Sequence, residues 1–154
     1  MTNTTNTPRV LVVEDQKYPL EAIQGAVNRV FPQNYSGFAK NGFDSAKFYD
    51  GAKHLVDGSS YDFVFLDHRM PRTDVGDLEE TDMDAFSGSL EGIGYGLISA
   101  IRGKNPNAVV IGTSSMDDGE LRRYGTLDFK LDKSSSGIFD DLRAILAKVR
   151  GGSK

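Results

Sequence analysis

Residues Tyr61–Pro71 read YDFVFLDHRMP, an apolar run that stops abruptly at polar residues. Within it, Phe63–Leu66 is continuously apolar, and Asp67 follows directly. Val10–Val13 is a second apolar run, rich in β-branched residues, and the acidic pair Glu14-Asp15 ends it. Short runs of this kind are typical of strands buried on both faces of a parallel sheet.

Further apolar runs alternate with segments of helical spacing along the chain. Val109–Ile111 predicts another strong strand, whereas Tyr35–Ala39 and Asp128–Leu131 predict poorer ones. Apolar residues at helical spacing predict five helices, near residues 23–31, 48–56, 97–101, 121–124 and 138–149. Five strands alternating with five helices predict an α/β fold, a doubly wound parallel sheet of five strands in the order 2-1-3-4-5.

Local signals place several boundaries. We expect Pro32 to end the first helix and Asp44 to cap the second. The two ends of the chain, residues 1–8 and 151–154, are expected to be disordered tails around a single domain of residues 9–150.

Composition excludes several classes of protein. The chain has 154 residues, of which 38% are hydrophobic and 26% charged, which suits one globular domain with a real core. It has no cysteine, so it forms neither disulfides nor thiolate metal sites, and we expect a cytoplasmic protein. No apolar run is long enough to span a membrane. The net charge of −4 argues against direct binding to nucleic acid.

Polar residues suited to phosphate chemistry follow the strong strands. Ligands of open α/β sheets bind outside the carboxyl ends of the strands, where the strand order reverses. In the expected order the first and third strands are neighbours there, so Glu14, Asp15 and Asp67 converge in one cleft. Three clustered carboxylates repel one another unless a cation compensates them, and Mg²⁺ prefers such oxygen ligands. Ser114 and Lys133 follow the later strands at the same edge.

The sequence resembles the receiver family of two-component response regulators over about residues 9–149. Five segments carry the resemblance: VLVVEDQ (10–16), AKNGFDSA (39–46), YDFVFLDHRMP (61–71), VVIGTSSMDD (109–118) and LDFKLDKSS (127–135). Their order and spacing together are specific. The resemblance implies the flavodoxin-like receiver fold and a single-domain regulator similar to those of chemotaxis.

The resemblance also implies a metal-assisted phosphoacceptor. Asp67 matches the aspartate that becomes an acyl phosphate. Asp15 matches a direct ligand of Mg²⁺, Glu14 matches a residue that acts through water, and the backbone carbonyl of Arg69 matches a further ligand.

Two more residues match groups that contact the phosphoryl group. Lys133 matches the lysine that pairs with a phosphate oxygen. Ser114 matches the hydroxyl residue that bonds the arriving phosphoryl group, with Thr113 as the alternative. We expect surface or loop positions for the two histidines, His54 and His68, because their spacing does not suit a metal site.

The sequence departs from the family pattern in two residues and one segment. Ser134 follows Lys133 where many receivers have a proline in cis, and Lys130 stands where an aromatic side chain often moves on activation. An acidic insertion, residues 72–94, has seven acidic residues and no lysine or arginine from Thr73 to Gly94. We interpret it as a solvated acidic loop, with a lid or a partner surface as the alternative. Met83, Phe86 and Leu90 also allow a short helix.

Three hypotheses of function follow. The leading one is a signalling switch, not a conventional enzyme: a histidine kinase or phosphotransfer protein donates, Asp67 accepts, and a downstream protein reads the change. Neither nucleic acid nor membrane is expected as a direct partner, and the oligomeric state stays open. The second is a non-switching binding module that uses the acidic insertion. The third is a magnesium-dependent phosphatase, which Arg69 disfavours because such enzymes commonly carry a carboxylate at that position.

Overall fold

The computed structural model describes residues 7–114, 125–133 and 136–151. Its main sheet has five parallel strands in the order β2-β1-β3-β6-β7. These are β1 (Val10–Val13), β2 (Asp44–Ala46), β3 (Phe63–Leu66), β6 (Val109–Gly112) and β7 (Phe129–Lys130). Counted along this sheet alone, the order is the predicted 2-1-3-4-5, which is confirmed.

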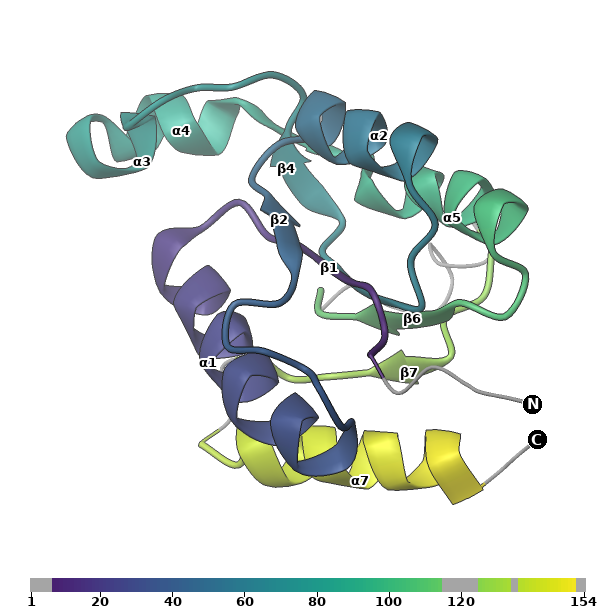
Figure 1. The fold of residues 1–154 in the computed structure, drawn as a ribbon. Coiled ribbons are helices and arrows are strands. Elements are labelled where there is room, and N and C mark those ends of the chain that lie inside the picture. The colour runs from purple at the N-terminus through teal and green to yellow at the C-terminus, as the bar shows by residue number, and fades with distance from the viewer. Residues whose placement is uncertain (1–6, 115–124, 134–135, 152–154) are drawn as a thin grey trace.

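Helices cover both faces of the sheet, as Figure 1 shows. α1 (Lys17–Asn34) and α7 (Ile138–Gly151) lie on one face, and α2 (Tyr49–Gly58) and α5 (Ile98–Lys104) lie on the other. Successive residues of a strand point to opposite faces. Val10 and Val12 therefore pack in the core beneath α1 and α7, whereas Leu11 and Val13 pack in the core beneath α2.

The second strand was predicted in the wrong place. Residues 35–39 form no strand; β2 begins at Asp44, which pairs with Leu11 and therefore does not cap α2. The Asp44 carboxylate instead accepts a hydrogen bond from the Tyr61 hydroxyl at 2.6 Å. Tyr35 and Phe38 look strand-like because they are apolar, but both pack on the ring of Phe31.

The first helix also continues past Pro32 to Asn34, so the predicted end is wrong. A proline this close to the carboxyl end removes one helical hydrogen bond but leaves the last turn in place. Phe31 holds that turn in the core, and the Asn34 side chain donates to the carbonyl of Val30 at 2.9 Å.

The acidic insertion is built from regular elements and is not a loop. β4 (Arg69–Pro71) and β5 (Leu90–Gly92) pair antiparallel, and α3 (Leu78–Thr81) and α4 (Met83–Gly88) lie between them. Asp82 caps α4 by accepting from the backbone N–H of Ala85. A short 3₁₀ helix, η1 (Gly94–Leu97), then leads into α5.

Two sequence expectations lie outside the described residues: the helix near residues 121–124 and the turn at Ser134. None of the helices in the described part of the chain is long and apolar enough to cross a membrane.

Candidate functional site

The site lies at the carboxyl edge of the sheet, where β1 and β3 end side by side. Val13 and Leu66 are partners in the ladder, and the backbone N–H of Asp67 donates to the carbonyl of Val13 at 3.1 Å. This register brings together three carboxylates with oxygens within 4.8 Å of one another: Glu14, Asp15 and Asp67. They are 0%, 3% and 5% exposed. The predicted convergence is therefore present in the structure.

Lys133 reaches the same cluster from the turn after β7. Its Nζ donates to Oδ2 of Asp67 at 3.0 Å and to Oε1 of Glu14. The other oxygen of Asp67, Oδ1, accepts from the backbone N–H of His68 at 2.8 Å. Both oxygens of Asp67 thus accept a hydrogen bond, which fixes the orientation of this carboxylate.

One lysine does not compensate three buried carboxylates. Burial, together with Glu14 and Asp67, raises the pKa of Asp15 to about 9. Burial and the charge of Asp67 also raise the pKa of Glu14, although Lys133 opposes this. Burial opposes charge on Lys133, but Asp67 and Glu14 outweigh burial and raise the lysine pKa. The cluster therefore favours binding of a cation.

The donor set fits Mg²⁺. All three clustered side chains offer hard oxygen ligands, and the described residues in this cluster include no sulfur or imidazole ligand. The cluster opens on a cavity of about 610 Å³, whose lining includes Asp15, Asp67, Arg69 and Lys133. This leaves room beside the carboxylates for water and for a phosphate group.

Two hydroxyl residues follow β6 and line the same cavity. The backbone N–H of Thr113 donates to the carbonyl of Leu66, which places Thr113 directly beside Asp67. Its hydroxyl is buried and has no hydrogen-bond partner among the described residues. Ser114, which we predicted for the phosphoryl contact, lies one residue further on and is only partly buried. The register therefore places Thr113, the alternative that the sequence left open, opposite Asp67.

His68 lies in the bend between β3 and β4, which agrees with the expected loop position, but it is buried and not at the surface. It is 1% exposed, and its Nδ1 accepts from the backbone N–H of Tyr95 at 3.0 Å. The two rings also pack together, with centroids 4.7 Å apart. His54, by contrast, is exposed as expected. An isolated histidine after a strand gives no sequence signal for such a contact.

Tyr95 and Gly94 are two further residues that sequence reasoning missed. The backbone N–H of Gly94 donates to the carbonyl of His68 at 2.8 Å, and a Cβ at Gly94 would overlap the carbonyl oxygen of Asp67. Tyr95 is fully buried, and burial raises its pKa to about 12 while nearby Ser114 opposes the rise. The glycines of Gly92-Ile93-Gly94 were the available signal for this close approach.

Comparisons with solved structures identify the fold. No family model and no curated protein matches the sequence. Solved structures do match. A CheY-like response regulator receiver domain from Methylobacillus flagellatus shares 19% identity at a TM-score of 0.61, over 93% of this chain and 98% of that one. The chain has the receiver fold.

Two further structures with the receiver fold are similar over nearly their whole length. The REC domain of the response regulator AraT from Geobacillus stearothermophilus has a TM-score of 0.62 and 21% identity, over 94% of this chain and 93% of that one. A CheY-like receiver domain protein from Methanospirillum hungatei JF-1 has a TM-score of 0.63 and 14% identity, over 94% and 95%. These similarities show the receiver fold.

Proposed function

We propose that this chain is a response-regulator receiver that accepts a phosphoryl group on Asp67 in the presence of Mg²⁺. One observation carries the proposal: Asp67 lies beside two other buried carboxylates and a lysine, facing a cavity at the carboxyl edge of the sheet. Neither a simple helix cap nor a solvated loop residue requires this set of neighbours.

The side chains divide the work between holding the metal and holding the phosphoryl group. Asp15 and Asp67 would ligate Mg²⁺ directly, Glu14 would act through water, and the backbone carbonyl of Arg69 would add a ligand. When bound, Mg²⁺ neutralises carboxylate charge and polarises a phosphate oxygen.

An oxygen of the Asp67 carboxylate attacks the phosphorus of the donor. An O–P bond to Asp67 forms, and the bond from phosphorus to the leaving atom of the donor breaks with its electron pair. The ammonium group of Lys133, which already donates a hydrogen bond to Asp67, then pairs with an oxygen of the phosphoryl group. The Thr113 hydroxyl, which has no other partner among the described residues, then donates to the phosphoryl group.

The product is the phosphorylated protein itself, which acts as a signal. The donor is a histidine kinase or a phosphotransfer protein, and a downstream protein reads the altered surface. We place this exchange in the cytoplasm, which suits a chain without cysteine.

Incubation with acetyl phosphate tests the proposal. In Mg²⁺, intact mass spectrometry should show one added phosphoryl group, which EDTA prevents. Asp67→Asn is the matched control and should remain unmodified. An adduct that forms equally well in Asp67→Asn would contradict the assignment of the acceptor.

A further inference from the structure

The first turn of α1 starts directly after the carboxylate cluster residues Glu14 and Asp15, and it is capped from a distant part of the chain. Gln16 makes no side-chain capping bond, and α1 has no acidic residue in its first turn. The backbone N–H of Lys17 instead donates to the two carboxylate oxygens of Glu79, at 3.0 and 3.3 Å. A carboxylate there satisfies a free N–H group and offsets the positive end of the helix dipole.

The capped turn follows directly after Asp15, which lies in the short connection between β1 and α1. Glu14, Asp15, Gln16 and Lys17 are consecutive, and the backbone N–H of Gln16 donates to Oε2 of Glu14 at 3.1 Å. Glu14 thus holds the N–H of Gln16 from inside the cluster, and Glu79 holds the N–H of Lys17 from outside. Both held N–H groups follow Asp15 directly in the chain.

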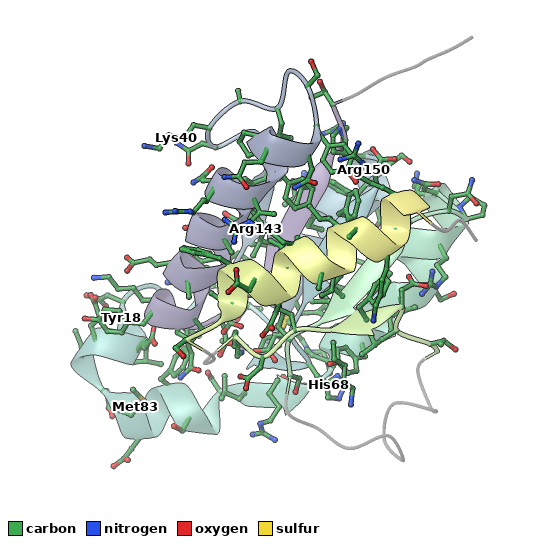
Figure 2. The ribbon with its side chains drawn as sticks, turned by 90° about the horizontal axis from the view of Figure 1, so that it is seen from below. Tyr18, Lys40, His68, Met83, Arg143 and Arg150 are labelled. Carbon is green, nitrogen blue, oxygen red and sulfur yellow. The ribbon has the colours of Figure 1, made fainter. Side chains whose placement is uncertain are left out.

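Glu79 belongs to the acidic insertion, which is itself anchored to the domain. Phe86 of α4 is 2% exposed, and the carbonyl of Arg72 accepts from the backbone N–H of Asp50 at 2.9 Å. In Figure 2 the insertion helices, where Met83 is labelled, lie beside the start of α1, where Tyr18 is labelled. Glu79 and Asp15 also line one common cavity of about 460 Å³.

Glu80, the next residue, provides an internal comparison. Its carboxylate pairs with Nζ of Lys17 at 3.1 Å, between two exposed side chains. Glu80 therefore links the same two elements without touching the backbone of the turn. Exposed ion pairs of this kind contribute little.

We infer that Glu79 is a positioning residue for the metal site, through which the acidic insertion holds the helix start that directly follows Asp15. The inference rests on the proposed function, since it assigns Glu79 a role in the affinity for Mg²⁺. It gives the insertion a task within the domain, in addition to any surface that it offers to a partner.

The test compares Glu79→Gln with Glu80→Gln in the full chain. Calorimetric titration with MgCl₂ should show roughly tenfold weaker binding for Glu79→Gln, as for other residues that orient a metal ligand. Glu80→Gln should stay within about twofold of wild type. In metal-free protein, the amide of Lys17 should exchange with solvent faster in Glu79→Gln alone. At saturating Mg²⁺, the phosphorylation rate of Glu79→Gln should return to that of wild type.

Two results would overturn the inference: unchanged Mg²⁺ affinity in Glu79→Gln, or an equal loss in Glu80→Gln. A phosphorylation rate that stays low at saturating Mg²⁺ would also overturn it, because the defect would then not lie in metal binding. Failure of the wild-type protein to bind Mg²⁺ would instead remove the proposed function on which the inference rests.

Discussion

Asp67 owes its surroundings to residues that are far apart in sequence. Its carboxylate accepts from Lys133, which is 66 positions away, and lies beside Asp15 and Glu14 at the end of another strand. Parallel strands end at one edge of the sheet, so short polar segments after each strand meet there. This rule made Glu14, Asp15, Asp67 and Lys133 predictable from the sequence.

The same rule does not specify contacts made beyond the strand ends. The pairing of His68 with Tyr95 depends on how the chain returns after the insertion, and nothing in the residues near either one encodes that path. The choice between Thr113 and Ser114 depends on the register of β6 against β3. A shift of one residue in that register would exchange the positions of the two side chains.

We predict that Thr113→Val slows phosphorylation by acetyl phosphate by roughly tenfold, because the phosphoryl group loses a charge-assisted hydrogen bond. Ser114→Ala, the matched control, should react at nearly the wild-type rate. Time courses of the intact mass measure both rates. A larger defect in Ser114→Ala would restore the assignment made from the sequence.

At the scale of elements, the start of η1 packs tightly against the residue that directly follows β3. A Cβ at Gly94 would overlap the backbone of Asp67 and come within 2.7 Å of the Met70 side chain. A Cβ at Gly103, in α5, would instead meet no neighbouring atom within 4 Å. Replacing Gly94 tests the effect of close packing, whereas replacing Gly103 tests the effect of backbone flexibility alone.

We predict that Gly94→Ala lowers the free energy of unfolding by about 1–3 kcal/mol, the usual cost of overpacking. Gly103→Ala should instead raise it by about 0.5–1 kcal/mol, because alanine favours the helix. Urea denaturation measures both. Equal effects of the two substitutions would contradict the close approach of Gly94 to Asp67.

The strands that could be predicted correctly are those whose burial in the sheet matches the apolar pattern of their sequence. β1, β3 and β6 are buried on both faces, so their apolar runs are unbroken. β2 is a three-residue strand at the edge of the sheet, Asp44-Ser45-Ala46, and has no such run. The strand-like aromatics Tyr35 and Phe38 belong to a turn that covers the core, which hydrophobicity alone does not distinguish from a strand.

For the whole molecule, we expect the acid cluster to make stability depend on pH and on metal. The raised pKa of Asp15, about 9 against an ordinary 3.8, means that the folded protein keeps a proton that the unfolded chain has lost. The unfolded state then binds fewer protons, so stability falls as pH rises between these two values. Binding of Mg²⁺ would displace that proton and should offset the loss.

We predict that the Tm of metal-free protein decreases from pH 6 to pH 9 and that added Mg²⁺ raises it most at the higher pH. Asp15→Asn, which carries no ionisable group there, should show a weaker dependence on pH and little response to Mg²⁺. Thermal unfolding in EDTA and in MgCl₂ provides the comparison. The raised pKa of Asp15 would be contradicted if, in EDTA, the difference in Tm between wild type and Asp15→Asn shifted in favour of wild type as the pH rises.

The central claim is that Asp67 itself carries the phosphoryl group, and chemical trapping tests it most directly. Borohydride reduces an acyl phosphate to an alcohol, so reduction after treatment with acetyl phosphate and Mg²⁺ should convert Asp67 to homoserine, detected by peptide mass spectrometry. We predict conversion at this position alone. Homoserine at Asp15, or phosphate held on His68 with Asp67 unchanged, would contradict the account.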